Sequence, residues 1–140
     1  METLEGLRRR RVIKKFRPEP GTVENAMDLA RRDVAVAGTM LGGNSDWAYT
    51  IAYNAMLQAG RALMFSKGYR PSGANQHIAV VRFVELFLDP EVVIAFDRMR
   101  RKRHITVYDM AGIVSEQEAE NAVARAEGFL DLIEGLLASG

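Results

Sequence analysis

The fold is decided by residues 45–68, whose sequence is SDWAYTIAYNAMLQAGRALMFSKG. Apolar side chains recur there at steps of three and four residues, which is the period of an α-helix. One apolar stripe consists of Ala48, Ile51, Ala52, Ala55, Ala59, Ala62 and Leu63, and a second beside it of Tyr49, Tyr53, Met56 and Leu63. The remaining polar line is narrow and runs through Thr50, Asn54, Gln58 and Arg61. Because a helix that is apolar over most of its circumference lies at the centre of its bundle, we predict a central helix over about residues 45–67.

Four further helices are predicted from the same periodicity, on either side of the central one. Ser115 followed by Glu118 is a capping box, which opens the last of them. No stretch shows the alternation and turn punctuation of a convincing strand. The predicted fold class is therefore all-α. The four flanking helices cover residues 22–41, about 78–87, about 91–109 and 115–136.

Length and composition suit a single folded domain. The chain has 140 residues, of which 48% are hydrophobic, so it can bury a sizeable core. Its 19 Lys and Arg against 18 Asp and Glu give a formal net charge of +1, which argues against a globally basic nucleic-acid binder. The absence of cysteine excludes disulfide scaffolds, zinc fingers and thiolate nucleophiles. Since neither a signal peptide nor a membrane-spanning segment is evident, we expect a cytoplasmic protein without membrane contact.

The first 21 residues carry the densest run of positive charge. Pro18 and Pro20 disfavour helix around Glu19, so we place a boundary there. Residues 1–21 are predicted to be a basic N-terminal arm or short helix, and residues 22–140 a helical bundle domain. The basic run is either a solvated, frayed arm or an arm that contacts phosphates. It consists of Arg8, Arg9, Arg10, Arg11, Lys14, Lys15 and Arg17.

The helix predicted over residues 91–109 carries the most distinctive chemistry. Its apolar positions Val92, Phe96 and Met99 continue in the same rhythm to Arg103, which therefore falls on the core-facing stripe. A buried arginine needs a carboxylate, a carbonyl or a phosphate as its partner. The adjoining face presents a carboxylate, a guanidinium, an imidazole and a phenol. These belong to Asp97, Arg100, His104 and Tyr108.

Spacing alone leaves two interpretations of this helix open. In the first, His104 and Tyr108 are packing residues, Asp97 and Arg101 form an i,i+4 salt bridge, and the other basic residues are solvated. In the second, the helix binds an anion or RNA, because imidazole transfers protons near neutral pH and guanidinium stabilises phosphate charge. The other histidine, His77, follows a loop and has no carboxylate at ligand spacing, so no metal site is predicted.

Two stretches of the chain resemble the HEPN-domain family. Residues 45–64, followed by residues 67–71 with the sequence KGYRP, are similar to the central helix of prokaryotic HEPN-domain proteins. Residues 97–104, DRMRRKRH, with residues 108–109 and the acidic last helix, resemble the motif helix of the same family. The resemblance covers roughly residues 22–138. It implies an up-and-down helical bundle, with a four-helix core and extra helical segments, that usually forms a dimer.

The resemblance also implies a catalytic motif, which is an arginine, four to six residues and then a histidine. Arg103 matches the arginine, His104 the polar position after it, and Tyr108 stands where the histidine would be. Arg98 and His104 fit the motif literally, but we prefer the first register because Arg103 continues the core stripe. The predicted catalytic residues are therefore Arg103, His104 and Tyr108. The predicted phosphate- or RNA-binding residues are Arg98, Arg100, Arg101 and Lys102, with Asp97 and Asp109 in supporting positions.

These features lead to two functional hypotheses. In the first, which the resemblance implies, the protein is a toxin-type, metal-independent endoribonuclease whose homodimer holds Arg103 and His104 in a cleft between protomers. In the second, it is a non-catalytic module that binds nucleotide, RNA or a partner protein. The resemblance implies that this partner is a minimal nucleotidyltransferase antitoxin. No cofactor is predicted for either hypothesis.

Overall fold

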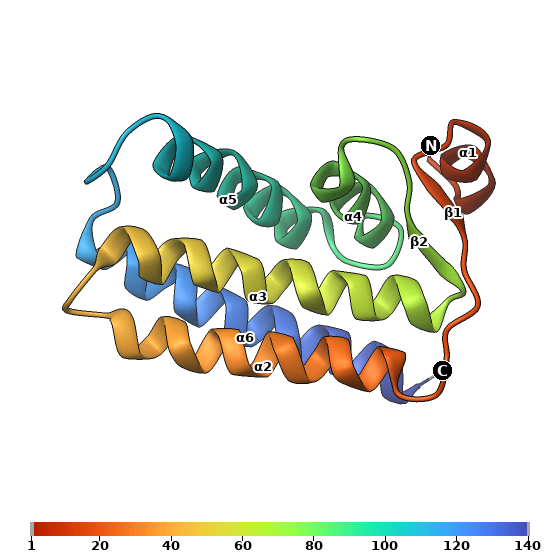
Figure 1. The fold of residues 1–140 in the computed structure, drawn as a ribbon, viewed down its shortest axis with the longest axis horizontal. Coiled ribbons are helices and arrows are strands. Elements are labelled where there is room, and N and C mark those ends of the chain that lie inside the picture. The colour runs from red at the N-terminus through yellow and green to blue at the C-terminus, as the bar shows by residue number, and fades with distance from the viewer. Residues whose placement is uncertain (1, 140) are drawn as a thin grey trace.

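The computed structural model describes residues 2–139, which form six helices and one two-stranded sheet. In chain order the elements are α1 (Leu4–Arg9), β1 (Ile13–Lys15), α2 (Thr22–Met40), α3 (Ser45–Ser66), β2 (Tyr69–Pro71), α4 (Gln76–Val84), α5 (Pro90–Tyr108) and α6 (Glu116–Ala138). The long helices α2, α3, α5 and α6 alternate in direction along the molecule (Figure 1). This confirms the predicted all-α, up-and-down bundle with a four-helix core and extra helical segments.

Helix α3 is the central helix, as the two apolar stripes predict. It packs against α2, α4, α5 and α6, and its apolar side chains are buried along nearly the whole length. The contact with α4 is especially close at Gly60, where an added Cβ would lie 2.5 Å from Cγ1 of Val80. A glycine at this position therefore lets α4 pack directly on α3.

Helices α5 and α6 are joined to α3 through aromatic packing, and a local cap defines the start of α6. The ring of Phe96 on α5 lies 5.7 Å from that of Tyr53 on α3 and 5.0 Å from that of Phe129 on α6. The predicted capping box is present, because the Ser115 hydroxyl accepts from the Glu118 backbone N–H and the Glu118 carboxylate accepts from the Ser115 N–H. Helix α5 is therefore anchored to both neighbours through its first half.

The prediction that the chain has no strand is wrong at one place. β1 pairs with β2 in antiparallel register, with Ile13 opposite Pro71 and Lys15 opposite Tyr69. Each strand has only three residues, too few to show an alternating pattern in the sequence. Leu7 and Ile13 are fully buried, so α1 and β1 are held against the bundle. The basic run therefore belongs to a folded element with exposed side chains, not to a frayed arm.

Between residues 2 and 139, no helix is both long enough and apolar enough to cross a membrane.

Candidate functional site

A pocket of about 340 Å³ lies between the second half of α5 and the N-terminal end of α4. Four of the residues predicted as site residues line one wall, which belongs to α5. They are Arg100, Arg103, His104 and Tyr108. The other wall consists of Ala74, Asn75, Gln76, His77 and Ile78. We call this hollow the α4–α5 pocket. Its lining contains two arginines and no carboxylate, so its electrostatic potential favours an anion.

Arg103 lies on the inward side of α5 but is only half-buried. Among the described residues, no carboxylate forms an ion pair with it. Its guanidinium carbon instead lies 5.8 Å from the centre of the Tyr108 ring. An aromatic face thus takes the place of the carboxylate, carbonyl or phosphate that the sequence predicts. The guanidinium N–H groups face no acid within residues 2–139 and can bind an added anion.

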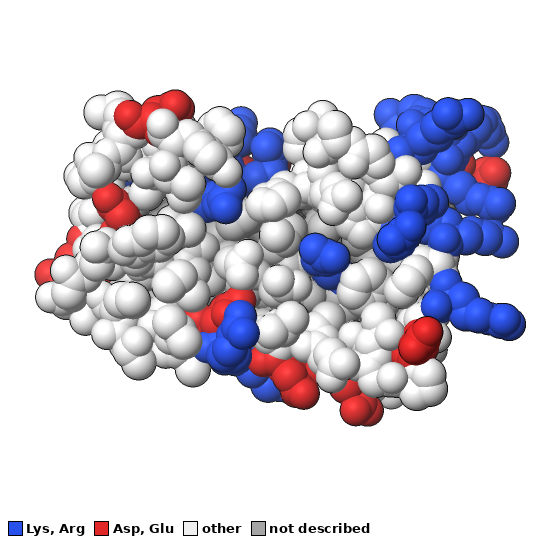
Figure 2. Space-filling view, viewed as in Figure 1, with Lys and Arg blue, Asp and Glu red and all other residues white. Residues whose placement is uncertain are grey.

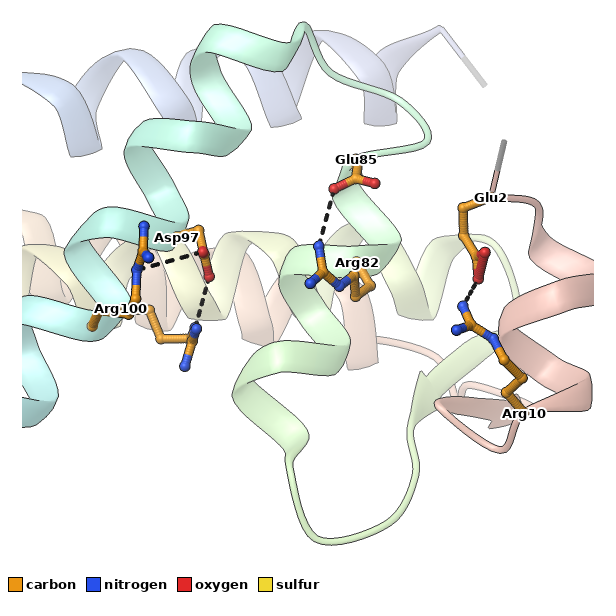
Figure 3. A network of polar contacts seen from close by, with 7 residues as sticks. Glu2, Arg10, Arg82, Glu85, Asp97 and Arg100 are labelled. Atoms are coloured by element: carbon orange, nitrogen blue, oxygen red, sulfur yellow. Dashed lines mark hydrogen bonds and ion pairs between the residues drawn. The ribbon is translucent and has the colours of Figure 1, made fainter.

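Arg100 is oriented by an acidic neighbour on the same helix. Its Nε donates to Oδ1 of Asp97 at 2.9 Å, and Oδ2 of Asp97 lies 3.6 Å from Nε of Arg101 (Figure 3). No further hydrogen bond from Arg100 is found within residues 2–139. The terminal nitrogens of Arg100 are therefore available to a ligand in the pocket. Asp97 thus orients Arg100, and its supporting role at the site stays a prediction.

His104 and Tyr108 form the outer rim of the pocket. Their ring centres are 4.8 Å apart, one helical turn from each other, and both side chains are exposed. Asp109 caps the C-terminal end of α5 and is also exposed, and it does not line the α4–α5 pocket. The role of Asp109 stays a prediction.

His77 is the site residue that the sequence did not indicate. It lines the pocket opposite α5, and its Nδ1 lies 3.0 Å from the hydroxyl of Tyr53, which is fully buried. Burial is the main cause that lowers the pKa of His77, and the charges of Arg103, Arg100 and Arg61 lower it further. Burial likewise raises the pKa of Tyr53, which keeps its hydroxyl protonated. Burial and the two neighbouring guanidinium groups thus favour the neutral form of the His77 imidazole.

The other predicted phosphate-binding residues lie on different faces of α5. Arg98 lines a separate hollow between α5 and α6, and Arg101 lines one nearer the start of α5. Lys102 forms an ion pair with Glu118 and lies 5.9 Å from the centre of the Tyr49 ring. Of the predicted phosphate-binding set, only Arg100 therefore lines the pocket together with the predicted catalytic residues.

Two groups that contact Lys102 have shifted pKa values, Glu118 through Lys102 itself and Tyr49 through burial. The hydrogen bond from Lys102 is the largest cause that lowers the pKa of Glu118, followed by the bond from the Ser115 backbone. Burial, helped by the charge of Glu118, raises the pKa of Tyr49 to about 12. Lys102 thus links α5 to α6, which is a structural contact outside the pocket.

The two registers of the sequence motif fall on different surfaces. Arg103, His104 and Tyr108 all line the α4–α5 pocket, whereas Arg98 and His104 line separate hollows. The register that starts at Arg103 is the one whose residues face a common space. Within residues 2–139, no three His, Asp or Glu side chains gather closely enough to hold a metal ion.

Exposed apolar side chains surround the open end of α5. Each of them has between 40% and 65% of its surface exposed, which is high for large apolar residues. They are Trp47 on α3 and Ile105, Val107, Tyr108 and Met110 in and just after α5. Trp47 and Val107 line the same hollow, so exposed apolar side chains of α3 and α5 adjoin there.

The comparisons with known proteins agree with this architecture. A family model described as HEPN domain matches residues 23–136. Among solved structures, TT1696 from Thermus thermophilus is similar, with a TM-score of 0.66 and 20% identity over 81% of this chain and 96% of that chain. At that identity the likeness concerns the fold alone. No curated protein matches the chain.

Proposed function

This chain belongs to the HEPN-domain family, and we propose that it is an RNA-targeting, toxin-type endoribonuclease. One observation carries the proposal, which is that the α4–α5 pocket combines two arginines, two histidines and no carboxylate. Guanidinium groups bind phosphate, and imidazoles donate and accept protons near neutral pH. RNA supplies both the phosphate and, in its ribose 2′-hydroxyl, the nucleophile. The pocket therefore has the groups that RNA self-cleavage needs.

In the proposed reaction, Arg100 and Arg103 hold the non-bridging oxygens of the scissile phosphate. The adjacent ribose 2′-oxygen attacks phosphorus while its proton passes to an imidazole, a role that we assign to His77. The bond from phosphorus to the 5′-oxygen breaks, and His104 as imidazolium gives that oxygen a proton. The products are a 2′,3′-cyclic phosphate and a free 5′-hydroxyl. The step balances without water or a further reagent.

The assignment of His77 as the base rests on its environment. A neutral imidazole can accept a proton, and both burial and the nearby arginines favour the neutral form. In the tautomer that carries its proton on Nδ1, the ring donates to the Tyr53 hydroxyl and Nε2 is free to accept. His77 thus supplies an imidazole within the protomer, although Tyr108 stands at the position of the motif histidine.

The N-terminal end of α4 adds a further attraction for phosphate. Its N-cap residue Asn75 makes no side-chain capping bond, so the first N–H groups of the helix have no side-chain acceptor there. Such N–H groups and the positive end of the helix dipole favour anions. They lie on the wall opposite Arg100 and Arg103, which would let a phosphate be held from both sides.

We propose that the active form is a homodimer with Arg103 and His104 in a cleft between protomers. The apolar patch at the open end of α5 supports this, because a second copy seated there would remove it from water. The approach of two basic helices requires neighbouring acids or a bound anion. Asp109 and the acidic face of α6 are exposed and can serve this purpose, while Asp97 already pairs with two arginines of α5 within the protomer. Sedimentation that shows only monomer at tens of micromolar would contradict the dimer.

One partner protein and one alternative function belong to the same proposal. Since the sequence resembles HEPN proteins paired with minimal nucleotidyltransferases, we propose such an enzyme as the antitoxin partner, to be tested by co-purification. The alternative is a module that binds RNA or nucleotide without cleaving it. The exposed Tyr108 at the motif histidine position favours this alternative.

A nuclease assay on total RNA and tRNA, without added metal, tests the proposal. Arg103→Lys keeps the positive charge but loses the planar guanidinium, which can donate two parallel hydrogen bonds. We therefore expect an intact fold and about tenfold weaker RNA binding, which corresponds to about 1.4 kcal/mol. His104→Ala should spare binding more than Arg103→Ala does and should lower cleavage by about 100-fold or more. Arg125→Gln, an exposed arginine on α6, is the control. Unchanged binding and cleavage in both Arg103 variants would reject the site.

A further inference from the structure

A second basic hollow adjoins the α4–α5 pocket. It measures about 200 Å³ and, like the pocket, has no carboxylate in its lining. The lining residues are Phe16, Arg61, Phe65, Arg70, Pro71 and Gln76. Gln76 lines both hollows, so the two meet at the start of α4. We call this second space the N-terminal hollow, because Phe16, from the N-terminal part of the chain, forms one of its walls.

The N-terminal element, which consists of residues 2–17 with α1 and β1, supplies Phe16 and is fixed to the bundle. The backbone N–H of Phe16 donates to the carbonyl of Gly68 at 2.9 Å, and that of Ser72 donates to the carbonyl of Val12 at 3.0 Å. These bonds extend the β1–β2 pairing at both ends. The wall that Phe16 forms is therefore a built part of the molecule. The family model begins only at residue 23, so this element is an addition to the matched domain.

Inside the hollow, arginines lie over aromatic rings. The guanidinium carbon of Arg70 is 5.8 Å from the centre of the Phe16 ring, and that of Arg61 is 5.8 Å from the centre of the Phe65 ring. The two rings are themselves 5.2 Å apart. A guanidinium stacked on a ring is held in place while the N–H groups at its edge stay available for phosphate or base edges.

The sheet places two positive charges directly opposite each other. Lys14 is the register partner of Arg70, and both side chains are exposed. Directly opposed like charges destabilise a strand pair. Among residues 2–139, no carboxylate forms an ion pair with either side chain. An anion bound across the pair would relieve the repulsion.

The rest of the element extends this positive surface. Figure 2 shows Lys and Arg gathered at the end of the molecule that carries α1 and β1. Within the described part of the chain, Arg10 is the one basic residue of this run with an ion pair, which it makes with Glu2 (Figure 3). The others are exposed without an acidic partner there. They are Arg8, Arg9, Arg11, Lys14, Lys15 and Arg17.

We propose that the N-terminal element binds single-stranded RNA and leads the strand through the N-terminal hollow into the α4–α5 pocket. Arginine beside aromatic rings in a basic groove is the combination by which proteins hold single strands. A single strand is flexible enough to follow two adjoining hollows and to offer successive phosphates to Arg70 and Arg103. This inference rests on the proposed function only where the RNA strand enters the α4–α5 pocket.

The test compares RNA affinity and its salt dependence in matched variants. Lys14→Gln with Arg70→Gln removes the opposed pair, and Arg31→Gln with Arg125→Gln makes the same charge change on the α2 and α6 side. Loss of two phosphate contacts should reduce the slope of log affinity against log salt concentration by about 1.4 for a single strand. If the two proteins bind equally at 1 M salt, this corresponds to roughly 25-fold weaker binding of the variant at 0.1 M salt. The control pair should keep the wild-type slope. Thermal melting should show the Lys14/Arg70 variant to be at least as stable as wild type.

RNA length separates this inference from the proposed function. The affinity for an oligo(U) strand that spans both hollows should fall in the Lys14/Arg70 variant. The affinity for a dinucleotide that fills only the α4–α5 pocket should fall in Arg103→Ala but not in the Lys14/Arg70 variant. Wild-type affinity and slope in the Lys14/Arg70 variant, or an equal loss in the control pair, would overturn the RNA path even if Arg103→Ala abolished binding. Binding of phosphatidylserine vesicles in place of RNA through the same charges would also overturn it.

Discussion

The two halves of α5 share one helical geometry but have opposite surroundings. In the first half, Val93, Ala95, Phe96 and Met99 are buried against the bundle. In the second half, from Arg100 to Tyr108, no side chain is buried. The first half contributes packing, and the second half places charged and aromatic side chains over a pocket. One helix can therefore be anchored at one end and serve binding at the other.

The largest test of this difference is Phe96→Ala. Phe96 is fully buried between Tyr53 and Phe129, so its removal leaves a cavity where three helices meet. We expect a loss of about 3–5 kcal/mol in the free energy of unfolding, measured by denaturant titration.

Ile105→Ala is the matched change in the second half of the same helix. Ile105 is 40% exposed, so the monomer should lose no more than about 0.5 kcal/mol. A large loss that is independent of protein concentration would show that the second half is packed as firmly as the first. A loss that grows with protein concentration would instead locate Ile105 in the proposed dimer contact.

An effect smaller than that of Phe96→Ala is expected from Gly60→Ala, which acts on the opposite wall of the pocket. The new Cβ would lie 2.5 Å from Val80, which is itself buried, so α4 must shift. Overpacking of this kind outweighs the gain in helix propensity, and we expect a net loss of about 1–2 kcal/mol. RNA binding should weaken as well, because α4 carries His77.

The control is Gly128→Ala on α6. No atom lies within 4 Å of its new Cβ, so stability should rise by up to about 1 kcal/mol. Equal stability of the two variants would reject the close contact.

Features with a local pattern could be predicted from the sequence. The apolar stripes of residues 45–67 located α3 within a residue or two, because every turn of that helix is in contact with a neighbour. Ser115 and Glu118 defined the start of α6, since a capping box is complete within four residues. The rhythm through Phe96 and Met99 correctly indicated the buried face of the first half of α5.

Features that depend on distant contacts could not be predicted. β1 and β2 pair across more than fifty residues, and neither has a pattern of its own. The same rhythm in α5 placed Arg103 in the core, but the buried face ends at Met99 and the arginine rests on Tyr108. His77 reaches the pocket only because α4 packs on α3. Nothing in the sequence around His77 indicates that its hydrogen-bond partner is Tyr53, which lies 24 residues earlier in the chain.

The smallest expected effect is a pH dependence that distinguishes the two walls of the pocket. The pKa of His77 is lowered in the folded state, by burial first and then by Arg103, Arg100 and Arg61. As the pH falls below about 6.5, the unfolded chain takes up a proton at this residue before the folded chain does. The contribution of His77 to stability is therefore fully present above about pH 6.5. It is lost as the pH falls from there to the lower folded-state pKa.

His77→Gln should remove this part of the acid destabilisation, whereas His104→Gln, on the exposed second half of α5, should retain it. The measurement is the free energy of unfolding of both variants and wild type between about pH 7.5 and pH 5.5, on either side of the ordinary histidine pKa. Carboxylates titrate alike in all three proteins, so the difference between variants isolates the imidazole. A parallel decline in the His77→Gln variant and wild type would mean that the folded protein protonates His77 as readily as the unfolded chain does. In that case His77 is not held neutral by its surroundings, and its assignment as the base loses its physical support.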